Sequence, residues 1–216
     1  MIIATTNAKG GVGKTTIAVH LAALAHKEGK KIIVLDCDAQ QSCSRWLSQV
    51  STEIQIHRAS TQKEIFRSVF ELRDQAELLI ADGPGGIAEQ TRPLLLVSDL
   101  AVVPCGPSKL DLEATLITLD MIEECRMVRK DGYPHAVFVP NRIQQHMTLS
   151  QDLINASRRL EVPVTETYLR YLQVYARAPG LGQVVWDIPN APSDAVGDMQ
   201  ILCKEILSYA DSRSNQ

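Results

Sequence analysis

The residues with the clearest chemical meaning form a glycine-rich stretch near the N-terminus, Lys9-Gly10-Gly11-Val12-Gly13-Lys14-Thr15-Thr16. Glycines permit backbone conformations that other residues avoid, so successive N–H groups can turn toward one centre. Lys14 adds a full positive charge, and the Thr15 hydroxyl can ligate a divalent cation. We call this stretch the phosphate loop, because the pattern is typical of loops that cradle phosphates; a turn that binds nothing is the alternative.

The segments around the phosphate loop are those that such a loop needs. A short β-rich run at 2–6 predicts a strand leading into it, and apolar residues at helical spacing predict a helix over about 15–27, which Gly29 ends. The N-terminus of that helix adds a partial positive charge where phosphate would lie. The loop is a variant of the Gly-x4-Gly-Lys-Thr pattern, since Ala8 stands at the first glycine position.

Three aspartates follow directly after apolar runs that predict further strands. Asp36 and Asp38 follow the second run, and Asp82 follows a later one. Magnesium prefers oxygen ligands and keeps several of its waters. Asp82 is therefore the candidate that holds Mg²⁺ through its water shell, with Thr15 as a ligand and Asp36 as a neighbour outside the ligand shell.

Apolar, strand-like runs alternate with helix-like stretches from end to end of the chain. The runs lie at 2–6, 32–35, 78–81, 100–103 and 136–139. Runs that are apolar throughout are typical of strands covered on both faces. The sequence therefore predicts a single α/β domain over 1–216 of the P-loop NTPase type, a mostly parallel sheet with helices on both faces. In such sheets, ligands bind beyond the carboxyl ends of the strands.

Two long amphipathic helices are predicted in the second half. The first spans about 110–129, and its apolar face consists of Ala114, Ile117, Met121, Cys125 and Val128. The last helix of the chain has an apolar face made of Val196, Met199, Cys203, Ile206 and Ala210.

The composition excludes several other classes of protein. With 45% hydrophobic and 22% charged residues the chain is globular, and its net charge of −3 excludes a globally basic nucleic-acid coat while leaving room for a local basic patch. No apolar run reaches the roughly 18 residues of a membrane span, and a signal peptide is not evident, so we expect a cytoplasmic protein. The five cysteines form no Cys-x-x-Cys pair, so we expect buried thiols rather than disulfides or a metal site.

Lys9 needs its own explanation, because Lys14 already supplies a charge to the phosphates. Here the sequence resembles the deviant Walker A ATPases of the ParA/MinD family, whose signature is Lys-Gly-Gly-x-Gly-Lys-Thr-Thr, and most closely the small ParF-type partition ATPases. The segments at 97–111 and 139–142 extend the resemblance. In that family the first lysine contacts the nucleotide of a partner subunit, which implies an ATP-dependent sandwich dimer; a solvated surface lysine is the alternative.

The resemblance also implies roles for other residues. ATP and Mg²⁺ are the implied cofactors, and hydrolysis to ADP and phosphate is the implied reaction. Asp38 matches the second aspartate of the family pattern Asp-x-Asp-Pro-Gln and is the candidate that positions the attacking water, although Ala39 replaces the proline. A helix N-cap near residue 42 is the alternative for Asp38. Asn141, with Arg142 beside it, is the candidate contact to the adenine edge.

The partners implied by the resemblance are a second copy of the chain, non-specific DNA, and a ParB-like or cargo-adaptor protein that stimulates hydrolysis. The ATP-bound form would associate with the nucleoid. The candidate DNA contacts are Arg158, Arg159, Arg170 and Arg177, for which solvated helix faces are the alternative. The polar stretch at 204–216 lacks the basic amphipathic character of a MinD-style membrane anchor, and the chain begins at its first strand, so we expect neither a membrane partner nor an operator-binding extension. Asp111 is expected to be a structural cap or an interface residue.

Two other functions share the same loop. One is an iron–sulfur protein related to the nitrogenase iron protein, for which Cys105 and Cys125 are the plausible cluster ligands. The other is a small-molecule ligase or kinase of the dethiobiotin-synthetase type. The cargo of a positioning ATPase does not follow from the sequence.

Overall fold

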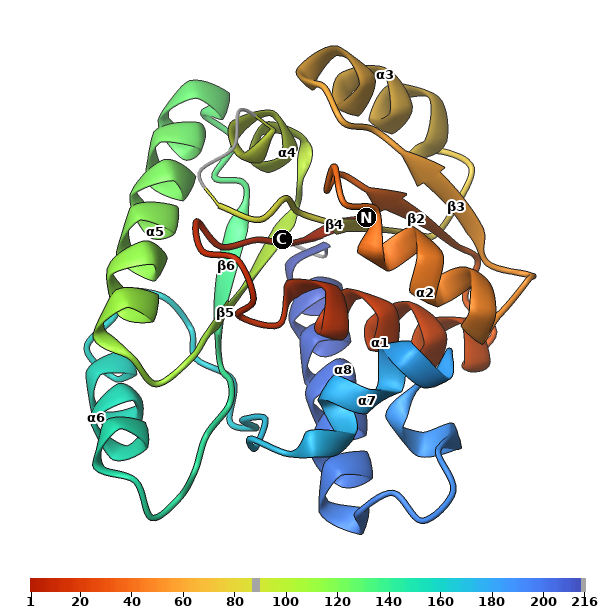
Figure 1. Cartoon of the computed structure of the whole chain (residues 1–216). Coiled ribbons are helices and arrows are strands. Elements are labelled where there is room, and N and C mark those ends of the chain that lie inside the picture. Colours follow the sequence, from red (N-terminus) through yellow and green to blue (C-terminus); the bar gives the residue numbers. More distant parts are fainter. Residues whose placement is uncertain (87–89, 215–216) are drawn as a thin grey trace.

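Six parallel strands form one sheet at the centre of the molecule, in the order β3-β2-β4-β1-β5-β6 (Figure 1). The structure is a computed structural model that describes residues 1–86 and 90–214. The strands are β1 (Ile2–Thr5), β2 (Ile32–Asp36), β3 (Gln55–Arg58), β4 (Leu78–Asp82), β5 (Leu100–Cys105) and β6 (His135–Pro140). The sheet is therefore wholly parallel over the part of the chain that the structure describes.

Helices cover both faces of this sheet, as the long apolar runs predict. On one face lie α1 (Lys14–Lys27), α2 (Ser42–Val50), α7 (Gln173–Leu181) and α8 (Ser193–Ser214), together with a 3-10 turn at Val185–Asp187. On the other face lie α3 (Gln62–Leu72), α4 (Thr91–Val97), α5 (Lys109–Arg129) and α6 (Thr148–Ser157). Adjacent strand residues alternate between the two cores: Ile3 packs with α1, and Ile2 packs with α3.

The strand register brings the predicted site residues to one edge of the sheet. Thr5, at the end of β1, pairs with Asp82 at the end of β4, which pairs in turn with Asp36 at the end of β2. The phosphate loop follows β1 directly and leads into α1. Three strand ends and one helix N-terminus therefore converge on the same point.

The five predicted strands are confirmed, and each differs from its predicted range by at most two residues at an end. The edge strand β3 was not predicted, because its sequence Gln-Ile-His-Arg has a single apolar residue and resembles a loop. The last helix is confirmed, with Met199, Cys203, Ile206 and Ala210 buried in the core.

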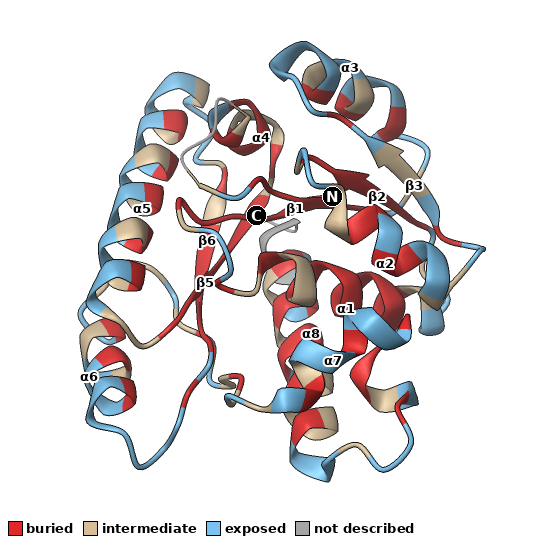
Figure 2. Ribbon diagram, viewed as in Figure 1, coloured by how far each residue is buried: buried red, intermediate tan, exposed pale blue. Residues whose placement is uncertain are grey.

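The apolar face predicted for α5 is confirmed at Cys125, which is buried, and wrong at Ile117 and Val128, which are 42% and 66% exposed. The other buried residues of the helix are Asp111, Thr115, Thr118 and Ile122. Figure 2 shows α5 with buried and exposed residues on different sides of the helix. The polar side of the helix faces inward because the hydroxyls of Thr115 and Thr118 accept hydrogen bonds from Asn7 and Ala8. No helix in residues 1–86 or 90–214 combines the length and hydropathy that a membrane crossing needs.

Candidate functional site

The phosphate loop has the backbone that its glycines allow. Gly11 and Gly13 have φ angles of 74° and 108°, in the left-handed region that side chains disfavour. A Cβ atom at Gly13 would also lie 2.2 Å from the amide nitrogen of Asn141, which donates a 2.6 Å hydrogen bond to the Val12 carbonyl. Gly13 is therefore required both for the turn and for this close approach.

Lys14 is the first residue of α1, and its ammonium lies inside the curve of the loop. Its Nζ donates hydrogen bonds to the carbonyls of Asn7 at 3.2 Å and Lys9 at 2.7 Å. Burial lowers the pKa of Lys14, and the charges of Asp82 and Asp38 oppose that shift. The cation is thus largely desolvated and held by loop carbonyls, a position from which it could bind an anion in the cavity.

Asp82 lies fully buried between two threonines. The Thr15 hydroxyl donates to its Oδ2 at 2.7 Å, and the Thr5 hydroxyl donates to its Oδ1 at 3.1 Å. Burial raises the pKa of Asp82 to about 7; the Thr15 hydrogen bond acts in the opposite direction, and the neighbouring charge of Asp36 adds to the rise. A buried carboxylate of this kind is stabilised by a nearby cation.

The oxygen atoms around Asp82 fit Mg²⁺ bound together with phosphates. Thr15 and Asp82 supply hard oxygen ligands, and no cluster of three or more His, Cys, Asp or Glu side chains suited to a metal occurs in the described ranges. Mg²⁺ needs only a few protein ligands when phosphate oxygens and water complete its coordination. Thr15 and Asp82 would hold the ion, which would neutralise charge on the phosphates.

Asp36 and Asp38 have different surroundings, which bear on the N-cap alternative. Asp36 is buried, and its carboxylate accepts from the Ser44 N–H at 2.7 Å and the Asp38 N–H at 3.1 Å. Asp38 accepts from the N–H groups of Gln40 at 2.8 Å and Gly85 at 3.2 Å. It is therefore Asp36 that satisfies an N–H in the first turn of α2, whereas Asp38 bridges two loops at the cavity wall.

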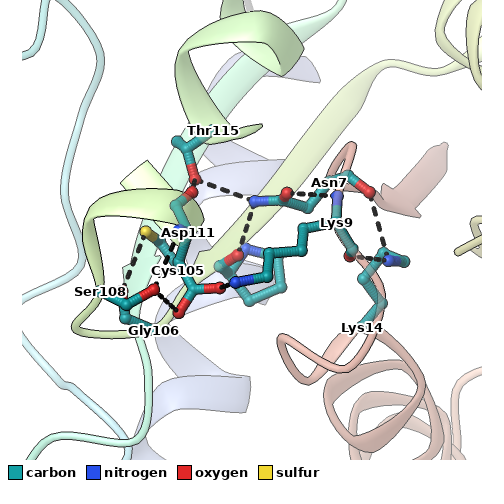
Figure 3. Close-up of polar contacts among 9 residues, drawn as sticks. Asn7, Lys9, Lys14, Cys105, Gly106, Ser108, Asp111 and Thr115 are labelled. Atoms are coloured by element: carbon teal, nitrogen blue, oxygen red, sulfur yellow. Dashed lines mark hydrogen bonds and ion pairs between the residues drawn. The ribbon is translucent and has the colours of Figure 1, made fainter. Parts of the chain in front are cut away.

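The segment Asn7–Lys9, which we call the upstream arm, is held by the inner face of α5 (Figure 3). The Asn7 amide donates to the Thr115 hydroxyl at 2.9 Å, and the Ala8 N–H donates to the Thr118 hydroxyl at 2.8 Å. The Lys9 ammonium forms an ion pair with Asp111 at 2.5 Å. These contacts were not predicted from the sequence, because they join segments about one hundred residues apart.

Ser108, not Asp111, is the N-cap of α5, which corrects the predicted cap role of Asp111. The Asp111 backbone N–H donates to the Ser108 hydroxyl at 3.1 Å, and that hydroxyl donates to the Asp111 carboxylate at 2.8 Å. The same carboxylate binds Lys9. In this structure Lys9 is therefore paired within its own chain.

A cavity of about 450 Å³ opens beside the phosphate loop. The loop and Asp38 form one wall, and Asn141 and Arg142 contribute to the lining. The rest of the lining was not predicted to contact a ligand, because its segment between β6 and α8 has no motif. It consists of Leu169, Arg170, Tyr171, Leu172, Tyr175 and Ala176. The apolar and aromatic side chains among these residues suit a flat ring, while the glycine-rich wall suits phosphates.

Comparison with known proteins agrees with this geometry. Residues 3–185 match the CobQ/CobB/MinD/ParA nucleotide binding domain. The chain belongs to that family. This MinD/ParA-family chain is 27% identical to the maintenance of carboxysome distribution protein A of Gloeobacter kilaueensis over 95% of its own length and 93% of that protein. It is 29% identical to protein ParA of Rhizobium radiobacter over 63% of its length and 62% of that protein.

Solved structures of the same fold extend the comparison. The ATP complex of a variant McdA from Cyanothece superposes with a TM-score of 0.76 at 14% identity, covering 96% of each chain. The cell division protein MinD of Aquifex aeolicus gives 0.72 at 16% identity, covering 94% of this chain and 96% of that one. At this identity the likeness shows the fold alone. The predicted P-loop NTPase fold is thus confirmed.

The four candidate DNA-binding arginines of this MinD/ParA-family chain do not lie together. Arg158 and Arg159 stand at the end of α6 on one face of the sheet, and Arg177 lies on α7 on the other face. The guanidinium of Arg170 binds the carboxylates of both Asp194 and Asp198. Arg170 therefore has its charge neutralised within the chain.

The cysteines are placed as expected for thiols with no ligand role. All five are free and buried. Burial raises the pKa of the Cys105 thiol to about 11, against which a contact with Thr115 has a smaller, opposite effect. An iron–sulfur cluster shared across a dimer axis needs cysteines that project from the surface, and neither Cys105 nor Cys125 does so.

Proposed function

We propose that this MinD/ParA-family protein is an Mg²⁺-dependent ATPase that dimerises with ATP and positions DNA or another large cargo. The observation that carries the proposal is the pair of lysines on the phosphate loop. Lys14 is buried under the loop and already faces the anion site, whereas Lys9 is 36% exposed at its side chain and extends from the opposite side of the loop. A second lysine with this exposure is suited to contact a nucleotide held by another subunit.

Each step of the proposed reaction has residues suited to it. The N–H groups of the phosphate loop and Lys14 bind the phosphates, and Thr15 and Asp82 hold Mg²⁺. Asn141 and Arg142 line the nucleotide cavity together with the aromatic wall. Hydrolysis further requires a group that orients water, since phosphoryl transfer depends on positioning and charge stabilisation. Asp38 is that group, because its carboxylate lies at the cavity wall and is held by the Gly85 N–H.

The proposed cargo step is release of the dimer from DNA when a partner protein stimulates hydrolysis. Non-specific DNA binding needs only a few contacts from Lys or Arg to phosphates, so a chain of net charge −3 can achieve it through a local patch. Arg158, Arg159 and Arg177 remain the proposed contacts. Arg170 is left out because two carboxylates bind it.

Sedimentation and DNA-binding measurements test the proposal. We expect a monomer with ADP and a dimer with ATP, and sequence-independent DNA binding that requires ATP and weakens steeply with salt. Substituting Arg158 and Arg159 by Ala should reduce the salt slope by about 2, because each phosphate contact contributes nearly one counterion. Substituting Lys30 and Lys31, at the amino ends of the strands, is the matched control. Equal DNA affinity with ADP and ATP, or turnover that responds to a metabolite and not to DNA or a protein, would contradict the proposal.

Asp38→Ala tests the hydrolytic step separately. Because Lys14, Thr15 and Asp82 remain, we expect Mg²⁺–ATP binding to persist while turnover falls about a hundredfold or more, the usual scale for a positioned catalytic group. The variant should accumulate as an ATP-bound dimer on DNA. Normal turnover would show that another group holds the water.

A further inference from the structure

Arg170 carries a charge that neither the phosphate loop nor the proposed DNA contacts use. Its Nε donates to Asp198 at 2.7 Å, and its Nη2 donates to the other oxygen of the same carboxylate at 2.9 Å. Its Nη1 donates to Asp194. Two parallel hydrogen bonds between a guanidinium and a carboxylate fix orientation as well as distance. We call Arg170, Asp194 and Asp198 the arginine clamp.

Helix α8 presents the acidic residues of the clamp on one face. Asp194 lies in its first turn, where the helix dipole favours a negative charge, and Asp198 follows one turn later. Glu205 lies two further turns along the same face, and its carboxylate accepts from the N–H groups of Glu166 at 2.6 Å and Thr167 at 3.1 Å. Helix α8 therefore binds the chain at two places just before it reaches the cavity.

The chain held in this way continues as part of the cavity lining, and we call residues 169–176 the ring-side segment. Its backbone is bound on another side to Ile143, whose N–H donates to the Leu169 carbonyl and whose carbonyl accepts from the Tyr171 N–H, both at 3.0 Å. Ile143 lies two residues after Asn141, which bonds to the phosphate loop. The ring-side segment is thus attached to the phosphate loop through residues 141–143 and to α8 through Arg170.

The two tyrosines of the ring-side segment differ in their contacts. The Tyr175 hydroxyl donates to the Ala195 carbonyl at 2.9 Å, which is a further attachment to α8 beside Asp194. Tyr171 lines the cavity and its residue is 61% exposed. Aromatic side chains stack on the faces of nucleobases, and a stacking contact requires that the ring be held at the right place. The attachments to α8 supply that placement.

We propose that Arg170 is a positioning residue for the base of the bound nucleotide, because the arginine clamp holds the ring-side segment where it contacts that base. The proposal rests on the proposed function, which makes ATP the ligand of this cavity. Arg170 acts through the segment, since each of its three guanidinium nitrogens already donates to a carboxylate. Without the clamp, base binding must order the segment at a cost in affinity, whereas the phosphate loop and Lys14 bind phosphates as before.

A contribution to stability alone does not account for the clamp. The side chains of Arg170 and Asp194 are 30% and 61% exposed, and exposed ion pairs contribute little to the free energy of unfolding. A DNA contact is also disfavoured, because two carboxylates surround one guanidinium. Positioning requires only that the pair fix a geometry, which its two parallel hydrogen bonds do.

Two ligands separate base binding from phosphate binding. ADP carries the base and pyrophosphate does not, and calorimetry with Mg²⁺ measures the affinity of the full chain for each. The ratio of the two affinities largely cancels changes in long-range charge, because both ligands are anions. We expect Arg170→Asp and, separately, Asp198→Arg to lower the ADP-to-pyrophosphate ratio about tenfold, since each places like charges together and releases the segment. The milder Asp198→Asn should lower the ratio in the same direction.

A charge exchange and a matched control complete the experiment. Arg170→Asp combined with Asp198→Arg reverses the pair and should recover most of the ratio, as expected for two residues that act through each other. Asp131→Arg is the control, because Asp131 also binds one arginine, Arg129, through several hydrogen bonds and does not line the cavity. It should leave the ratio unchanged whatever it does to the melting temperature.

Three results would overturn the proposal. These are an unchanged ratio in both single variants, an equal fall in the ratio with Asp131→Arg, and a ratio that stays low in the combined variant, which would mean that Arg170 contacts the base itself. None of them depends on dimerisation, hydrolysis or DNA, because ADP is the only nucleotide used. If the unaltered protein bound no ADP, the proposed function would fail as well, whereas a constant ratio contradicts the role of Arg170 alone.

Discussion

Helices α1 and α5 lie on either side of the phosphate loop and differ in how much of their buried face is polar. Helix α1 buries apolar side chains such as Ile17 and Leu21 against the sheet. Helix α5 buries Thr115 and Thr118, whose hydroxyls accept hydrogen bonds from the upstream arm. Buried backbone and amide N–H groups need partners, so a helix that packs on a loop is turned to supply them. The neighbour of a helix, and not its hydrophobicity alone, therefore decides which face is buried.

The two lysines of the loop differ in the same way. Lys14 belongs to α1 and is 5% exposed, with its ammonium on loop carbonyls. Lys9 extends to α5 and pairs with Asp111 at its surface. Lys14 is therefore part of the site itself. Lys9 is held by a single ion pair, in which a competing anion could replace Asp111.

Substitution of each lysine gives the largest expected contrast. Lys14→Ala should weaken ATP binding about a hundredfold or more, because it removes a charge-assisted contact from a desolvated site. Lys9→Ala should leave ATP binding by the monomer nearly intact but abolish the ATP-dependent dimer. Calorimetry and sedimentation measure the two effects, with Lys27→Ala at the exposed end of α1 as the control. If Lys9→Ala still forms the ATP-dependent dimer to the same extent, Lys9 does not contact the nucleotide of the other subunit in the way proposed.

Truncating one apolar residue on each helix tests which faces are core. Leu21→Ala should lower the free energy of unfolding by about 2–5 kcal/mol, because Leu21 is fully buried. Ile117→Ala should change it by no more than about 0.5 kcal/mol, since Ile117 is 42% exposed. Denaturant unfolding measures both values. A comparable loss in the two variants would show that Ile117 is covered in the isolated protein.

Acid should weaken the α1 side of the molecule through His20. Its Nδ1 donates to the Thr16 carbonyl and its Nε2 accepts from the Val185 N–H, which fixes the neutral ring. Burial lowers its pKa to about 4, partly opposed by the Thr16 hydrogen bond. As pH falls from about 6.5 to 4, His20 takes up a proton in the unfolded chain but not in the folded protein, so its contribution to stability should fall by about 3 kcal/mol and then level off, while the raised pKa of Asp82 acts in the opposite direction.

Unfolding free energies at several pH values, compared with those of His20→Gln, isolate this contribution from Asp82 and from the other four histidines. The difference in unfolding free energy between the two proteins should change by about 3 kcal/mol across that window. The same slope in both proteins would show that His20 is not its source.

A smaller loss of stability than that of Leu21→Ala is expected from a change on the polar face of α5. Thr118→Val keeps the shape of the side chain but leaves the buried Ala8 N–H without an acceptor, which should cost about 1–3 kcal/mol of stability. Thr118→Ser retains the hydroxyl and is the control. Thermal unfolding distinguishes them, and equal stability of the two variants would mean that the upstream arm does not depend on this contact.

Much of the site could be predicted because its parts are local in sequence. The glycines, Lys14 and Thr15 stand within eight consecutive positions, and Asp36 and Asp82 directly follow apolar runs that only a strand explains. The parallel arrangement then requires these strand ends to meet. The cavity wall with Tyr171 and Tyr175 could not be predicted, because no spacing in that segment indicates what lies opposite it.

The sequence alone determined the α/β alternation, the phosphate loop and the strand ends around it, since hydrophobic periodicity and glycine placement act over a few residues. Only the tertiary structure decided which face of α5 is buried, that Lys9 pairs with Asp111, and that Asp36 rather than Asp38 bonds to the first turn of α2. The first two depend on polar partners about one hundred residues away along the chain, and the third depends on how the loop between β2 and α2 folds. Such partners exist only once the chain has folded, because hydrogen bonds and ion pairs are set by position in space and not by order in sequence.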